Sequence, residues 1–139
     1  MSLVLDASVT LSWYFDDERT PASDAVLDQV AATGAVVPSL WRMEVANGFQ
    51  MAIRRKRIDR DFRDRAVRHL GLLPITVDPE TDTYVWTAML RLADRFGLTV
   101  YDAAYLELAQ RRDLPLASVD KALGAAGKKL GVPILGRKR

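Results

Sequence analysis

Short apolar runs alternate with longer helix-like segments along the whole chain, and this alternation restricts the folds available to it. Apolar runs of strand length cover residues 3–5, 35–37, 75–77, 116–117 and 133–135. Segments with helical spacing lie between them, roughly at residues 9–15, 22–32, 39–55, 59–72, 79–96, 101–112 and 121–130. Continuous apolar runs are typical of strands covered on both faces. The pattern predicts an α/β domain of three α/β/α layers, with a mainly parallel sheet of about five strands.

The chain of 139 residues is long enough for one domain with its own core, and we expect residues 1–139 to form a single domain. It contains no cysteine, which excludes disulfides and thiolate metal sites and fits a reducing compartment. No apolar run reaches the length of a membrane span, and the N-terminus does not resemble a signal peptide. We therefore expect a cytoplasmic protein without a membrane partner.

Basic residues are concentrated in one part of the chain, although the net charge is only +2. One compact run consists of Arg54, Arg55, Lys56 and Arg57, and the C-terminus, Arg137, Lys138 and Arg139, is also basic. Such clusters suit the phosphate backbone of nucleic acids. The alternative is a solvated helix end and a charged terminus without a specific partner.

Acidic side chains follow two of the apolar runs. Asp6 comes directly after residues 3–5, and Asp120 comes shortly after residues 116–117. Because ligands of parallel α/β sheets bind beyond the carboxyl ends of the strands, we expect both carboxylates at the same edge of the sheet. An alternative is open for each acid, since both precede a predicted helix, where Asp is a favoured cap and a favoured charge.

A serine lies two residues from each of these acids. The Ser8 hydroxyl is placed to orient the Asp6 carboxylate or a metal-bound water. Ser118 precedes Asp120 and is itself a candidate cap for the last long helix. Both hydroxyls are expected at the sheet edge where the acids lie.

Glu44 lies in the helical segment 39–55, which is apolar almost all round. Between residues 43 and 53 the polar side chains are those of Glu44, Asn47 and Gln50, three residues apart. This spacing predicts one narrow polar stripe along an otherwise buried helix. The stripe is either a thin solvent-facing edge or one wall of a polar cleft. Its Glu, Asn and Gln residues, in place of Lys and Arg, favour the cleft.

Asp102 opens the helical segment 101–112 and shares a helix face with Tyr105, Leu106 and Ala109. A carboxylate on a core-facing stripe is costly unless it is hydrogen-bonded or coordinated. Thr99 lies three residues earlier, so a capping box is the competing interpretation. The two roles are compatible, because a helix N-terminus stabilises a carboxylate in either case.

These acids together predict a particular chemistry if the fold brings them together. Clustered carboxylates raise one another's pKa unless cations neutralise them. Hard divalent ions such as Mg²⁺ or Mn²⁺ are the natural partners of an all-oxygen site. Such ions can activate a water molecule and stabilise the leaving oxygen of a phosphodiester. We expect the single histidine, His69, to lie on a helix surface without a catalytic part.

Four segments of the chain resemble, in order and spacing, the motifs of PIN-domain ribonucleases. They are Val4-Leu5-Asp6-Ala7-Ser8, Met43-Glu44-Val45-Ala46-Asn47, Tyr101-Asp102-Ala103-Ala104-Tyr105 and Ala117-Ser118-Val119-Asp120. Within that family the chain is most similar to VapC toxins of bacterial toxin–antitoxin modules. The resemblance covers essentially the whole chain, and no acid of the pattern is missing.

The resemblance implies a PIN-like fold, one or two Mg²⁺ or Mn²⁺ ions, endonucleolytic cleavage of RNA, a homodimer, and inhibition by a VapB-like antitoxin. By position, Asp6 and Asp102 match the primary metal ligands of the family. Asp120 and Glu44 would complete the catalytic site, directly or through water. Ser8, Asn47 and Ser118 match polar positions beside these acids.

The resemblance also implies binding roles for two further surfaces. Trp13, Tyr14 and Phe15 would help to form an apolar groove for an antitoxin helix, although core packing is the alternative for at least two of them. The basic run of residues 54–57 would guide RNA to the acidic site.

Two other classes of protein are weighed against a nuclease. A receiver-like signalling domain also gathers acids around Mg²⁺, and Asp78 follows the run 75–77 as a phosphoacceptor would. However, no paired acids follow the first strand, and the nearest candidate lysine, Lys121, directly follows Asp120. The second alternative keeps the fold but makes the chain a non-catalytic RNA-binding or scaffold protein.

Overall fold

The structure is a computed structural model that describes residues 2–137. Within this range, five short strands form one sheet in the order β3-β2-β1-β4-β5, and every neighbouring pair is parallel. The strands are β1 (Leu3–Leu5), β2 (Ala35–Val37), β3 (Ile75–Val77), β4 (Leu116–Ala117) and β5 (Ile134–Leu135). The predicted parallel sheet of about five strands is confirmed.

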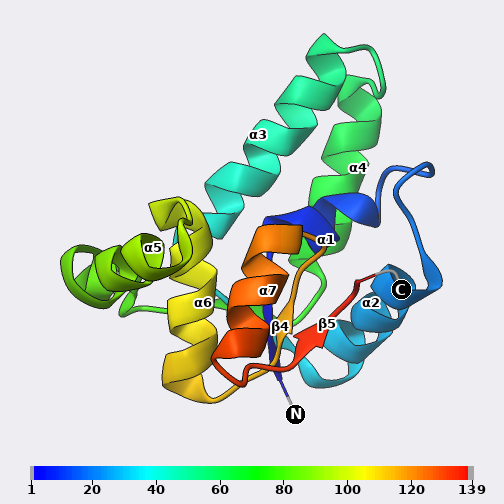
Figure 1. The fold of residues 1–139 in the computed structure, drawn as a ribbon. Helices are drawn as coiled ribbons and strands as arrows, with labels where there is room; N and C mark the ends of the chain where they lie inside the picture. Colours follow the sequence, from blue (N-terminus) through cyan, green and yellow to red (C-terminus); the bar gives the residue numbers. More distant parts are fainter. Residues whose placement is uncertain (1, 138–139) are drawn as a thin grey trace.

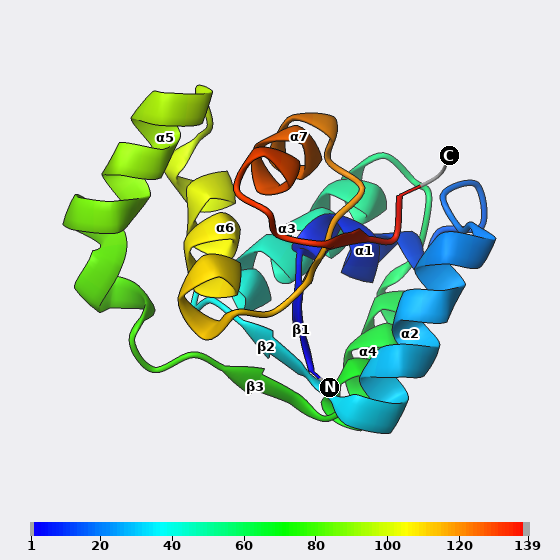
Figure 2. The same cartoon turned by 60° about the horizontal axis from the view of Figure 1, so that its bottom comes forward.

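Helices cover both faces of the sheet, which gives the predicted three layers (Figures 1 and 2). The chain steps from β1 outward to β3, then crosses back to β4 and β5. Because such crossovers are right-handed, the two halves place their helices on opposite faces. The first half contributes α1 (Ala7–Ser12), α2 (Pro21–Thr33), α3 (Trp41–Arg54) and α4 (Arg60–Gly71). The second contributes α5 (Leu90–Phe96), α6 (Val100–Arg112) and α7 (Lys121–Lys129).

The predicted helix at 79–96 is wrong in its first half. The segment forms a 3₁₀ turn, Thr81–Tyr84, then a π turn, Val85–Met89, and only then α5. The Thr81 hydroxyl binds the Asp78 carboxylate and accepts the Ser39 amide. Such side-chain bonds hold the backbone in a tight turn at the expense of a regular helix start.

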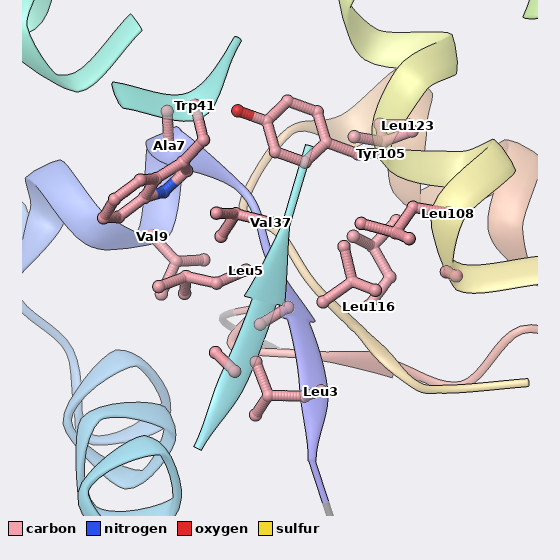
Figure 3. Packing of buried hydrophobic residues seen from close by; sticks show 14 of the residues in the cluster. Leu3, Leu5, Ala7, Val9, Val37, Trp41, Tyr105, Leu108, Leu116 and Leu123 are labelled. Carbon is pink, nitrogen blue, oxygen red and sulfur yellow. The ribbon is translucent and has the colours of Figure 1, made fainter. Parts of the chain in front are cut away.

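Burial of the strands follows their place in the sheet. The three central strands β1, β2 and β4 are buried throughout. Figure 3 shows Leu5 and Val37 close together near Val9, and Leu116 on the other side of the sheet beside Leu108. The outer strands β3 and β5 are partly exposed. The expectation that every strand is covered on both faces is therefore wrong for β3 and β5. These two strands lie at the edges of the sheet.

Close packing of α3 on α1 depends on Gly48. A Cβ atom at this position would clash with Leu11 Cδ1, so any side chain would force Leu11 to move. The indole of Trp41, at the start of α3, also donates a hydrogen bond to the buried Thr10 hydroxyl of α1. These contacts place the first turn of α3, and with it Glu44, beside the end of β1.

Asp78 is an anchor of an ion-pair network and not an exposed phosphoacceptor. Its carboxylate is buried at the end of β3 and pairs with Arg111 at 2.6 Å and Arg112 at 2.8 Å. Arg111 also pairs with the buried Glu107 at 2.7 Å. The two arginines hold the pKa of Asp78 down at about 2, against the cost of burial. The network ties the end of α6 to β3, and it removes the receiver-like interpretation of this residue.

We expect Asp78→Asn to destabilise the protein. Because the pKa of Asp78 falls from 3.8 unfolded to about 2 folded, its charge adds stability that is fully present above pH 3.8. The difference corresponds to about 2 kcal/mol at pH 7. This contribution to the free energy of unfolding decreases as the pH falls through 2. Urea unfolding of the parent and of Asp78→Asn at pH 7 and at pH 2 measures the contribution, and Asp94→Asn on the exposed face of α5 is the control. If Asp78→Asn lowered the free energy of unfolding equally at the two pH values, the stabilisation could not come from the charge of Asp78.

Candidate active site

Asp6 lies at the carboxyl end of β1 and is only 5% exposed. One of its carboxylate oxygens, Oδ2, accepts hydrogen bonds from the hydroxyls of Ser8 at 2.8 Å and Ser118 at 2.7 Å. Although Asp6 occupies the residue before α1, its side chain makes no capping bond to that helix. Burial raises the pKa of Asp6 above its ordinary value, more than the two hydroxyls lower it. The capping alternative is therefore not what the structure shows for this acid.

The strand order places the ends of β1 and β4 side by side. The chain leaves β1 toward β2 on one side and returns to β4 on the other, so the sheet reverses its winding direction between these two strands. Open α/β sheets bind their ligands at such a switch point. The Asp6 amide donates to the Ala117 carbonyl at 3.0 Å, which joins the two strand ends.

Asp120 follows β4 in the chain and directly precedes α7. Its Oδ1 accepts the Leu123 amide at 2.8 Å, so this acid caps α7 as the alternative interpretation expected. Ser118, in contrast, is not the N-cap residue of α7. Its hydroxyl accepts the Asp120 amide at 3.0 Å while it donates to Asp6. Ser118 thus connects the two acids.

Glu44 lies in the first turn of α3 and is half-buried. Its Oε1 accepts a hydrogen bond from the hydroxyl of Tyr105 on α6. Burial raises the pKa of Glu44, and the nearby charge of Asp102 raises it further. Asn47 and Gln50 are exposed, as is Met43 at 77%. The prediction of an otherwise buried helix is therefore wrong. After Glu44, the polar stripe is part of an exposed face of α3.

Asp102 lies in the first turn of α6. Its amide donates to the Thr99 hydroxyl at 3.1 Å, so Thr99 caps the helix as the capping alternative expected. The rest of the helix is buried almost all round, from Ala103 to Ala109. Burial raises the pKa of Asp102, with further increases from the charges of Asp120 and Asp6.

The pKa of Asp6, of Glu44 and of Asp102 is raised in each case by the charge of another acid of this set. Asp102 interacts with Asp6, Asp120 and Glu44, and Glu44 in turn interacts with Asp6. None of the four takes part in an ion pair within residues 2–137, so their negative charge is not neutralised by a basic side chain there. The fold has thus brought together all four acids that the sequence singled out.

A set of carboxylate and hydroxyl oxygens fits the ligand chemistry of Mg²⁺ or Mn²⁺. In the described part of the chain, however, no three acidic or histidine side chains are close enough as they stand to share a metal ion. The donor chemistry is therefore in place, whereas a closed coordination shell is not formed.

The aromatic run at the end of α1 divides between core and surface. Trp13 and Phe15 are 7% and 6% exposed, and the Trp13 indole donates to the Ser23 carbonyl. Tyr14 is half-buried, and its hydroxyl bonds Nδ1 of the exposed His69 at 2.6 Å. Tyr14 and Phe15, but not Trp13, line a surface groove beside the α3–α4 connection. Core packing thus accounts for two of the three, the alternative left open by the sequence.

The basic run lies at the tip of the projecting α3–α4 pair (Figure 1). Arg54, Arg55 and Lys56 are exposed. Arg57 is held by Asp17 at 2.7 Å and Glu18 at 3.0 Å, and its guanidinium stacks on Phe15. Ten residues of helix separate Glu44 from Arg54, a distance of about 15 Å along α3. Lys138 and Arg139 of the basic C-terminus lie outside the described residues.

A family model described as PIN domain matches residues 3–129. The chain therefore belongs to the PIN domain family, as the order and spacing of its acidic motifs predicted. Among curated proteins it is similar to Ribonuclease VapC3 of Pyrobaculum aerophilum, with 28% identity over 133 residues that make up 96% of this chain and 100% of that protein. The chain is thus a homologue of a VapC ribonuclease.

Solved structures show the same fold. PAE2754 from Pyrobaculum aerophilum has a TM-score of 0.68 and 25% identity, with 96% of this chain and 92% of that chain covered. VapBC2 from Rickettsia felis, solved bound to a DNA fragment from its promoter, has a TM-score of 0.64 and 13% identity, with coverage of 96% and 97%. Among residues 2–137, no helix is both long and apolar enough to cross a membrane.

We expect Asp6→Asn to stabilise the metal-free protein at pH 7. Because the folded pKa of Asp6 is raised, its ionised form destabilises the fold above that pKa, and the penalty disappears below 3.8, where the carboxyl is protonated in both states. Removal of one buried charge is expected to add roughly 1 kcal/mol. Calorimetric melting in EDTA at pH 7 and pH 3 measures the change, beside the exposed control Asp28→Asn. A lower melting temperature for Asp6→Asn at pH 7 would contradict the assignment.

Proposed function

We propose that this protein is a metal-dependent endoribonuclease toxin of the VapC type, which hydrolyses RNA phosphodiester bonds. The observation that carries the proposal is that Asp6, Glu44, Asp102 and Asp120 lie near the sheet's switch point and take part in no ion pair within residues 2–137. The PIN domain match and the ribonuclease VapC3 relative support the same conclusion.

Each acid has a role that follows from its position. Asp6 and Asp102, which come from a strand end and a helix start and interact electrostatically, would hold the divalent ion. Glu44 and Asp120 would complete the site, directly or through water. Ser8 and Ser118 bind the same oxygen of Asp6 and so leave its other oxygen free of these two hydroxyls. When bound, Mg²⁺ or Mn²⁺ would supply an activated water and neutralise charge on the phosphate.

We further propose that RNA approaches along α3. The exposed residues Arg54, Arg55 and Lys56 form a cationic tip, whereas the charge of Arg57 is offset by Asp17 and Glu18. Cationic groups near an acidic site counter the repulsion between its carboxylates and the RNA backbone. The part of the predicted basic run that is available to bind RNA is therefore its first three residues.

A VapB-like antitoxin is the proposed protein partner. The groove beside the α3–α4 connection is lined by the aromatic residues Tyr14, Phe15 and Phe62, together with charged residues of both signs. A partner helix with one apolar face would match these aromatic residues. Structures of VapBC proteins are among the similar folds, which supports this partner class. A homodimer and action in the reducing cytoplasm are part of the same proposal.

Cleavage of RNA should require a divalent metal and the first two acids. We expect Asp6→Asn and Asp102→Asn each to lower the cleavage rate at least about 100-fold, because each removes a proposed metal ligand. A titration of Mn²⁺ against mixed RNAs, with Asp94→Asn as a fully active control, measures this. If the parent binds RNA but never cleaves it with any divalent ion, the chain is the non-catalytic RNA-binding alternative.

The basic tip should be visible in the salt dependence of RNA binding. We expect the double variant Arg54→Glu, Arg55→Glu to bind RNA more weakly and to lower the slope of log affinity against log salt by roughly 0.7 for each phosphate that is no longer neutralised. Binding is measured in EDTA, so that no cleavage occurs. The matched control is Arg91→Glu, Arg95→Glu on α5, which changes the net charge equally on the opposite face of the sheet. An unchanged slope in the first variant would sink the proposed path.

A further inference from the structure

Tyr105 is a large core residue that also contacts the acidic site, although its position in the sequence suggested only a core residue. Its side chain is 0% exposed and ranks among the largest fully buried groups of the core. The polar end of this side chain points away from α6, toward Ala7 and Trp41, as Figure 3 shows. A phenol oxygen at that place reaches the space between the end of β1 and the start of α3.

The hydroxyl is a permanent donor in that space. It donates to Oε1 of Glu44, across 61 positions of sequence. A phenol is protonated at neutral pH, so this hydroxyl donates its hydrogen to the Glu44 carboxylate. None of the four acids takes part in an ion pair within residues 2–137, and Tyr105 supplies a neutral donor to one of them.

Glu44 gains more from such a partner than Asp6 or Asp120 does. It lies on a helix whose next polar residues, Asn47 and Gln50, are exposed, and its long side chain can turn toward solvent. Asp6 is already held by two serine hydroxyls, and Asp120 by a backbone amide. A fixed donor from α6 restricts Glu44 to the side of the helix that faces Asp6. Groups that orient metal ligands in this way are known to change metal affinity strongly.

We propose that Tyr105 is a positioning residue of the acidic site, whose buried hydroxyl holds Glu44 beside Asp6 and thereby sets the affinity of the site for a divalent cation. This inference rests on the proposed function, since it requires the acids to bind a metal. It goes beyond that function because it assigns a role to a residue that carries no charge and comes from the core face of α6.

The test is a calorimetric titration of Mn²⁺ into the full chain without RNA. Tyr105→Phe removes only the hydroxyl, and we expect it to weaken Mn²⁺ binding about 10-fold. Tyr101→Phe is the matched control, because Tyr101 lies one turn earlier on α6 and is 64% exposed. It should bind Mn²⁺ as the parent does. Circular dichroism melting shows whether each variant remains folded at the titration temperature.

A double-mutant cycle separates positioning from packing. If Tyr105 acts through Glu44, then Tyr105→Phe should have no further effect on Mn²⁺ affinity in a Glu44→Ala background. An equal loss in both backgrounds would assign the effect to packing and overturn the proposal, as would parent-like binding by Tyr105→Phe or an absence of Mn²⁺ binding by the parent. If the cycle behaves as expected but no RNA is cleaved, Tyr105 keeps its role and the proposed nuclease function alone fails.

Discussion

The parallel pairing of β1 with β4 is the contact on which the rest of the site depends. These strands are neighbours in the sheet although more than a hundred residues separate them, with Val4 opposite Leu116 and Leu5 opposite Ala117. The sheet reverses its winding direction between them. Because the helices before and after this point lie on opposite faces of the sheet, the residues that follow the two strands can meet beyond the strand ends. Asp6 and Ser118 are those residues.

Placing acids at this edge has a cost in stability. Burial raises the pKa of Asp6, Glu44 and Asp102 in the folded chain, and their mutual repulsion adds to that effect. A divalent cation would reverse both penalties, because it favours the ionised form of its ligands. The same fold neutralises its other buried acids internally, as Asp78 is paired with Arg111 and Arg112. Asp78 and Glu107 are paired with arginines, whereas the four acids near the ends of β1 and β4 take part in no ion pair within residues 2–137. This difference distinguishes the structural cluster from the candidate site.

Several parts of the fold cooperate to bring α3 and α6 to the strand ends. Gly48 allows α3 to approach α1, and the indole of Trp41 fixes the start of α3 on Thr10. The network around Asp78 ties the far end of α6 to β3. The hydroxyl of Tyr105 then links the two helices at the acids themselves. Residues distant from the acids therefore contribute to how those acids are placed.

The sheet and its parallel strands could be predicted from the sequence, because apolar periodicity is a local pattern. The family could be predicted from the order and spacing of the acidic motifs. The choice between the alternatives needed the folded structure: Asp120 and Thr99 cap helices, Asp6 does not, and Trp13 and Phe15 pack in the core. The partnership of Tyr105 with Glu44, like that of Asp78 with Arg111, joins residues far apart in the chain. Local patterns carry no record of such pairings, since these depend on how the strands are ordered and how closely the helices pack.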